Sequence, residues 1–244
     1  MLAEHLGMSE RSSIGFPVRS WSGDDRGWPE QSLEHGDLRI TGTVLDDGAS
    51  WHVTTDRLGW TTIALIAVPD GCSDGPDVVE AMRLAAAECS DPVQTARILR
   101  VALGKRAAGV GLAVARIGPY GRIVELLNVS LPAVLHWDPI EGMSPFEPMC
   151  DSLDDLGLDV RTEILRLSGG AALAFATPGV LTRDADFKEL RGFVRAMALD
   201  PLGGTVAEAP PTELARLLRS SWGRQPGPTA VVVLGLPCER RQVA

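Results

Sequence analysis

The length, composition and charge of this chain exclude several classes of protein. It has 244 residues, of which 45% are hydrophobic and 23% are charged, so it can bury a core and is not disordered throughout. Its formal net charge of −9 argues against nucleic acid or an anionic membrane as a partner, because both are bound through basic surfaces.

The first predicted elements are an arm and a β-hairpin. Residues 1–36 show no sustained periodicity and predict a loosely structured N-terminal arm, followed by a domain over residues 37–236 and a tail over residues 237–244. Residues 38–45 alternate between apolar and polar, and Asp46, Asp47 and Gly48 are typical of a turn. We therefore expect a hairpin that returns through residues 51–54.

A buried strand and two helices follow. Residues 61–68 are apolar almost throughout, as in a strand that is buried on both faces. Pro76 stands where the first residue of a helix is favoured, and apolar residues then recur at helical spacing as far as Cys89. Asp91 and Pro92 predict the start of a second helix, which ends at Gly104.

The rest of the chain reads as strands, two helices and a last strand. We predict a meander over residues 110–117, 122–127 and 131–137, and a hairpin of 160–167 with 171–177. Helices are expected around residues 187–197 and 212–219, before a last strand at 229–234. Strands and helices grouped in this way predict an α+β fold built as an antiparallel sandwich.

The sequence also bears on location and on common catalytic motifs. It has no run of about 18 apolar residues and no apolar leader, so we expect a cytoplasmic protein. The four cysteines form no CxxC pair and the four histidines have no ligand-like spacing, which disfavours a zinc site. The HExxH, GxxxxGK[ST] and GxGxxG motifs are absent.

One carboxylate stands out as a candidate metal ligand. Asp70 follows the buried strand and opens a glycine-bracketed loop, Gly71-Cys72-Ser73-Asp74-Gly75, before a helix. A rigid strand end is a good platform for an oxygen ligand of a hard cation. An aspartate that forms a turn or caps the helix is the other interpretation, and the residues alone leave both open.

The same stretch resembles the PPM (PP2C-like) serine/threonine phosphatases, in particular their bacterial SpoIIE/RsbX-like branch. Asp70-Gly71-Cys72-Ser73-Asp74-Gly75 is similar to the family's DGLGHG, residues 111–117 to its AVAVARID strand, and Asn128-Val129-Ser130 to its GNVS turn. Thr177-Pro178-Gly179-Val180 stands where TDGL is expected, and residues 228–232 where DDATVVV is expected. The resemblance implies a PP2C-like αββα sandwich of two antiparallel sheets flanked by helices.

The resemblance also implies a two-metal centre, and this sequence keeps little of it. The family uses Mn²⁺ or Mg²⁺ ions held by aspartates to activate a water that attacks phosphoserine. Asp70 and Gly71 retain their family positions, whereas the other aspartate positions hold Ala49, Pro178, and Gly227 or Pro228. Ser22-Gly23-Asp24 matches the start of the family's SGDAW motif literally. The carboxylates that could substitute are Asp24, Asp25, Asp46, Asp47, Asp74, Asp184 and Asp186.

Two readings of function come from these departures. One aspartate and one carbonyl make a weak site for hard cations, so we assign no catalytic residue and expect no cofactor. The resemblance then implies a pseudophosphatase that binds a regulatory protein of anti-sigma or antagonist type in a bacterial partner-switching circuit for stress signalling. The alternative is an active phosphatase that uses Mn or Mg on substitute aspartates. A scaffold domain with an exposed apolar patch and a small-molecule sensor with a deep pocket beside Asp70 are further alternatives.

Overall fold

The computed structural model describes residues 31–35, 38–44, 48–69, 75–89, 91–138, 140–181 and 227–236. The predicted helices around 187–197 and 212–219 lie outside these ranges, as do most of the N-terminal arm and the C-terminal tail. Residues 1–36 were predicted to be a loosely structured arm. The end of this segment instead contains a short strand, β1 (Gln31–His35), which pairs with β2 (Leu38–Val44).

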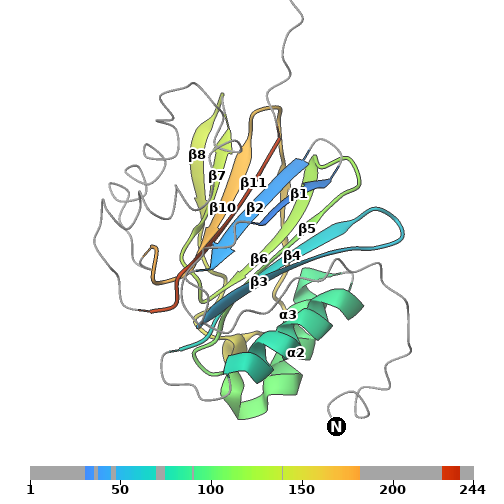
Figure 1. Cartoon of the computed structure of the whole chain (residues 1–244). Helices are drawn as coiled ribbons and strands as arrows, with labels where there is room; N and C mark the ends of the chain where they lie inside the picture. Colours follow the sequence, from blue (N-terminus) through green and yellow to red (C-terminus); the bar gives the residue numbers. More distant parts are fainter. Residues whose placement is uncertain are drawn as a thin grey trace, which may run out of the picture.

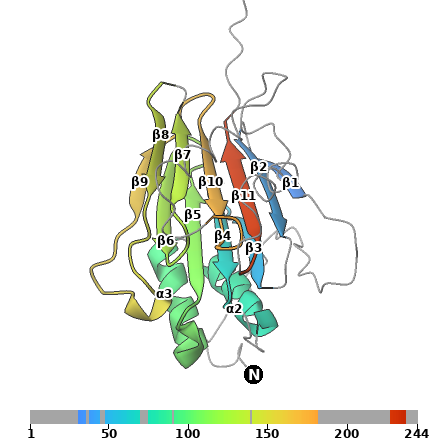
Figure 2. The same ribbon diagram turned by 90° about the vertical axis from the view of Figure 1, so that its left-hand side faces the viewer.

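The described strands form two antiparallel sheets that face each other (Figures 1 and 2). The six-stranded sheet has the order β1-β2-β11-β10-β7-β8, and the five-stranded sheet has the order β3-β4-β5-β6-β9. The remaining strands are β3 (Ala49–Thr55), β4 (Thr61–Ala67), β5 (Gly111–Ile117), β6 (Ile123–Val129), β7 (Val134–Asp138), β8 (Gly142–Phe146), β9 (Glu163–Arg166), β10 (Ala172–Ala176) and β11 (Ala230–Gly235). The predicted antiparallel sandwich is confirmed.

Two α-helices cover the outer face of the five-stranded sheet, as Figure 1 shows. Helix α2 (Gly75–Glu88) packs on β3 and β4, and α3 (Pro92–Leu103) packs on β5 and β6. The Asp91 side chain accepts the Gln94 N–H at 2.9 Å and so caps α3. Both helices and the fully buried strand β4, which lies between β3 and β5, agree with the sequence prediction.

Apolar side chains fill the space between the sheets and the space beneath the helices. Trp51, Leu65, Phe175 and Val232 belong to the cluster between the sheets. A second cluster joins α2 and α3 to the five-stranded sheet. These clusters explain why β4 is apolar on both faces: one face contacts the opposite sheet and the other contacts α2.

The predicted hairpins are wrong where the chain changes sheets. β2 pairs with β1 and β11, whereas β3 pairs with β4, so residues 45–48 connect the two sheets and do not close a hairpin. The same holds for β9 and β10, and the third strand of the predicted meander, β7, belongs to the other sheet from β5 and β6. β8 is a strand that the sequence analysis did not predict.

Two 3₁₀ helices complete the described elements. The helix η1 (Gly104–Ala107) follows α3, and η2 (Leu153–Asp155) lies between β8 and β9 in the chain. No helix in the described ranges combines the length and the apolar character that a membrane crossing requires.

Candidate functional site

One end of the sandwich collects the segments that the family resemblance singled out. The register places Ala49 beside Ala67, Ala67 beside Gly111, and Ala230 beside Val44. The chain leaves β4 at this end through Val68 and Pro69 and continues toward residue 70. We call this region the β4 exit end.

Two turns are joined at the β4 exit end. The Thr177 hydroxyl donates to the Pro228 carbonyl at 2.6 Å and accepts the Ala230 N–H at 2.7 Å. The Gly179 N–H donates to the same Pro228 carbonyl at 2.9 Å. Thr177 and Thr229 are fully or almost fully buried, so neutral hydrogen bonds hold turn 177–179 against turn 227–229.

The contact between these turns is too close for larger residues. A Cβ at Gly179 would collide with the Thr229 hydroxyl and with the Gly227 carbonyl. Gly227 has a φ of 115°, which favours glycine, and a Cβ there would lie 3.6 Å from the Pro178 Cβ. The two positions at which the resemblance expects aspartates are therefore neighbours, and both lack a carboxylate.

A third segment, the start of β3, meets the same turns. The Val68 N–H donates to the Gly48 carbonyl at 2.7 Å. A Cβ on Gly48 would lie 2.9 Å from the Pro228 Cβ and 3.1 Å from the Val68 carbonyl oxygen. Gly48 thus permits the connection between the sheets to pass close to Pro228. Ala49, the next residue, is buried and apolar.

The structure places some predicted site residues and leaves others outside the described ranges. Ala49, Pro178, Gly227 and Pro228 lie at the β4 exit end. The candidate ligands Asp70 and Gly71 and the possible substitutes lie outside the described residues; these substitutes are Asp24, Asp25, Asp46, Asp47, Asp74, Asp184 and Asp186. Within the ranges the structure describes, no three His, Cys, Asp or Glu side chains are grouped so as to hold a metal ion.

The turn after β6 lies at the same end of the five-stranded sheet. Asn128 is buried, and its Nδ2 donates to the Pro132 carbonyl at 2.9 Å. The backbone of Asn128 accepts the Met149 N–H at 2.8 Å, and the Ser130 N–H donates to the Cys150 carbonyl at 3.0 Å. These bonds fix residues 149–150 beside the end of β6. The sequence analysis did not anticipate this, because residues 142–150 have no clear periodicity.

Two buried histidines lie away from the β4 exit end. His52 on β3 is 6% exposed, and burial, followed by the nearby Arg83, lowers its pKa to about 4. Burial also lowers the pKa of His136 on β7. Both rings are neutral at pH 7 and each has a nitrogen without a hydrogen-bond partner in the described structure.

Several solved structures share this fold. RsbX in complex with magnesium is 12% identical, with a TM-score of 0.65 over 85% of this chain and 100% of that chain. The PP2C phosphatase domain of SpoIIE from Bacillus subtilis is 13% identical, with a TM-score of 0.59 over 86% of this chain and 72% of that chain. The chain has the PP2C-type phosphatase fold.

A third PP2C-type structure contains a second kind of domain. The RsbU and RsbW domains of Rv1364c from Mycobacterium tuberculosis match with 13% identity and a TM-score of 0.62, over 82% of this chain and 62% of that chain. No protein-family model and no curated protein matches the sequence. At these identities the likeness concerns the fold, so activity has to be argued from this chain's own residues.

Proposed function

We propose that this chain is a PP2C-like pseudophosphatase that acts by binding a regulatory protein of anti-sigma or antagonist type in a bacterial partner-switching circuit. The observation that carries the proposal is the junction of turns 177–179 and 227–229. At the two positions where the family resemblance expects aspartates, this junction has Pro178 and Gly227 or Pro228. Neutral hydrogen bonds from Thr177 and Gly179 to the Pro228 carbonyl join the two turns.

The chemistry of this junction argues against a pair of hard cations. Mg²⁺ and Mn²⁺ prefer several carboxylate oxygens, and two such ions near one aspartate repel each other with little compensation. The hydroxyl of Thr177 and the carbonyl of Pro228 are already engaged with each other. Asp70 and the Gly71 carbonyl would then be the remaining family ligands, and any ion they held would serve as a Lewis acid.

The fold supports a role in partner switching. RsbX, SpoIIE and the RsbU domain share the fold, and the last of these is joined to an RsbW domain in the solved structure. A PP2C-like domain with a reduced metal centre retains the end of the sandwich at which its catalytic relatives would receive a phosphoprotein. We therefore assign partner binding to the β4 exit end, in the cytoplasm.

Metal titration and turnover test the proposal. Calorimetry with Mn²⁺ and with Mg²⁺ is expected to detect no tight binding of two ions. Dephosphorylation of phosphoserine peptides is expected to stay near background for the wild type and for Asp70→Asn alike. Robust Mn²⁺-dependent turnover that Asp70→Asn abolishes would establish instead an active phosphatase with substitute aspartate ligands.

A substitution close to Asp70 in the sequence tests binding separately. Ser73→Trp, three residues after Asp70 in the sequence, is expected to weaken capture of the anti-sigma or antagonist proteins encoded in the same genome, measured with purified proteins. Ile140→Thr is the matched control, because Ile140 is 91% exposed beside the β7–β8 turn. Unchanged capture by Ser73→Trp, with an unchanged circular dichroism spectrum, would exclude the β4 exit end as the binding surface.

A further inference from the structure

The edge strand β9 has main-chain groups that face away from its sheet. β9 pairs with β6 and ends the five-stranded sheet, at the left margin of the molecule in Figure 2. The Leu167 N–H donates to the Arg122 carbonyl at 2.9 Å, one step beyond the pair Ile123 and Arg166. Hydrogen-bonded and non-bonded pairs alternate along an antiparallel ladder. The N–H and C=O groups of Ile164 and Arg166 therefore point away from β6.

The side chain at the centre of this edge is apolar and exposed. Ile164 is 70% exposed, although it lies on a strand, and Arg166 beside it is also exposed. Natural sheet edges are commonly guarded by short length, charged side chains, prolines or bulges. β9 is four residues long and carries the exposed Arg166, but it has no proline and pairs with β6 without a bulge. Its exposed central isoleucine and outward main-chain donors and acceptors can accept an added strand.

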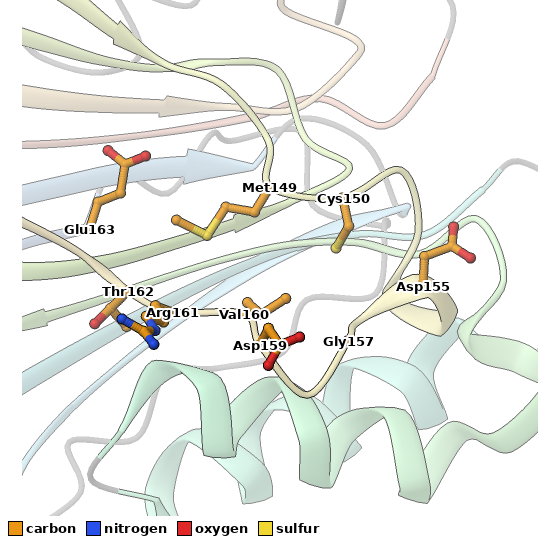
Figure 3. A pocket seen from close by; sticks show the side chains of 9 residues that line it. All are labelled: Met149, Cys150, Asp155, Gly157, Asp159, Val160, Arg161, Thr162 and Glu163. Atoms are coloured by element: carbon orange, nitrogen blue, oxygen red, sulfur yellow. The ribbon is translucent and has the colours of Figure 1, made fainter.

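A pocket opens where β9 begins. It is a depression largely open to solvent, with a volume of about 590 Å³. Met149 and Cys150 lie on one side of it and Val160 lies on the other, as Figure 3 shows. These side chains give the pocket an apolar wall, and Glu163 connects it directly to β9.

The charge of the pocket indicates what it binds. Three carboxylates line it, those of Asp155, Asp159 and Glu163, together with the guanidinium of Arg161, and Figure 3 shows the carboxylates at separate places along the pocket. An arginine or lysine side chain fits this lining, because its aliphatic stem can lie on the apolar wall while its cationic end reaches one of the carboxylates. An acidic side chain would be repelled.

The pocket wall is held in place by helix α3. Arg97 donates to the Leu158 carbonyl at 3.0 Å, and Arg100 donates to the Leu156 carbonyl at 2.9 Å. Leu153 and Leu156 are buried against the helix side of the sheet. A preformed wall reduces the entropy cost of binding. Leu158, which stands between the lining residues Gly157 and Asp159, is 90% exposed.

We propose that β9 and this pocket together dock an extended segment of a partner protein, which adds as a strand to β9 and inserts a basic side chain into the pocket. The inference rests on the proposed function, since it names a second surface by which the domain holds a protein partner. It places that surface on the β6–β9 side of the sandwich, apart from the junction of turns 177–179 and 227–229.

Capped synthetic peptides test this docking surface on the full chain. The probe alternates threonine and valine and carries one central arginine; its matched versions carry glutamate or norleucine at that place, or N-methyl groups on alternate amides. Fluorescence anisotropy is expected to give about tenfold weaker binding for norleucine, the value of one charge-assisted contact, and no binding for the glutamate or N-methylated peptide. In the NMR spectrum of the protein, the amides of Ile164 and Arg166 should shift.

Variants of the protein complete the test. Asp159→Asn together with Glu163→Gln is expected to remove the preference for arginine over norleucine, and Ile164→Thr to weaken binding of both peptides. Ile140→Thr, at another exposed isoleucine, is the matched control and should change neither. Equal binding of the arginine and glutamate peptides, shifts confined to other strands, or no binding of any peptide would each overturn the docking surface.

These outcomes are separable from those of the proposed function. Mn²⁺-dependent turnover would overturn the pseudophosphatase assignment and leave peptide binding at β9 in place. Failure of every peptide would remove the docking surface and leave the metal titration and turnover results unaffected.

Discussion

Replacement of Thr177 by valine should destabilise the domain by about 2 kcal/mol, because the junction of the two turns depends on one buried hydroxyl. This hydroxyl is an acceptor for the Ala230 N–H at 2.7 Å and a donor to the Pro228 carbonyl at 2.6 Å, in a residue that is 0% exposed. Valine has nearly the same shape, so the change deletes the hydrogen bonds and leaves no large cavity. A buried donor left without a partner costs about 1–3 kcal/mol.

The two hydrogen bonds contribute unequally to the expected loss of stability. Pro228 keeps one partner in the variant, since its carbonyl also accepts the Gly179 N–H at 2.9 Å, so most of the loss comes from Ala230. For a domain of this size about 2 kcal/mol corresponds to a fall of roughly 4–8 °C in the melting temperature. Urea denaturation followed by tryptophan fluorescence measures the free energy of unfolding directly.

A matched control lies in the same junction. The Thr229 hydroxyl is also buried, but its one hydrogen bond in the described structure, to the Gly227 carbonyl, is 3.4 Å long. Thr229→Val should therefore cost less than about 1 kcal/mol. Equal losses for the two valine variants, or no loss for Thr177→Val, would refute the claim that the Thr177 hydroxyl holds the turns together.

Three further predictions concern other parts of the fold. Burial lowers the pKa of His52 from 6.5 to about 4. As the pH falls from 6.5 to about 4, the unfolded state takes up a proton before the folded state does, so the free energy of unfolding decreases by about 3 kcal/mol. His52→Leu should abolish this pH dependence of the free energy of unfolding in urea titrations at several pH values. Gly42→Ala should cost about 1–3 kcal/mol in the same assay, because its Cβ would collide with the Trp51 ring, whereas Gly75→Ala has open space and should be nearly neutral. Asp91→Ala removes the N-cap of α3 and should cost about 1 kcal/mol in thermal unfolding, whereas Asp91→Asn should restore most of it.

The sequence was informative where the signal is local. The apolar run of β4 and the helical spacing after Pro76 each depend on neighbouring residues, and both predictions are confirmed. The hairpins failed for a physical reason: a turn such as Asp46-Asp47-Gly48 looks the same whether the chain reverses within one sheet or crosses to the opposite sheet. Strand alternation carries no information about which sheet a strand joins.

The candidate site also has features that the sequence indicated and features that only the structure shows. The resemblance to the family aligned Pro178, and Gly227 or Pro228, with family ligand positions. The hydrogen bond from the Thr177 hydroxyl to the Pro228 carbonyl, however, depends on pairing between residues far apart in the chain. The pocket beside β9 combines residues 149–163 from an irregular segment. Such a segment has no period from which a binding wall could be inferred.

The position of β11 determines when this fold can form. β11 lies between β2 and β10 and pairs with both, so residues 230–235 are the link between the N-terminal and later strands of the six-stranded sheet. During synthesis, β2 emerges from the ribosome long before β11. The pairing of β2 with β11 therefore joins residues that are far apart in the sequence, which slows folding. A chain cut before residue 230 would leave the edges of β2 and β10 that face β11 unpaired, open to association with other chains.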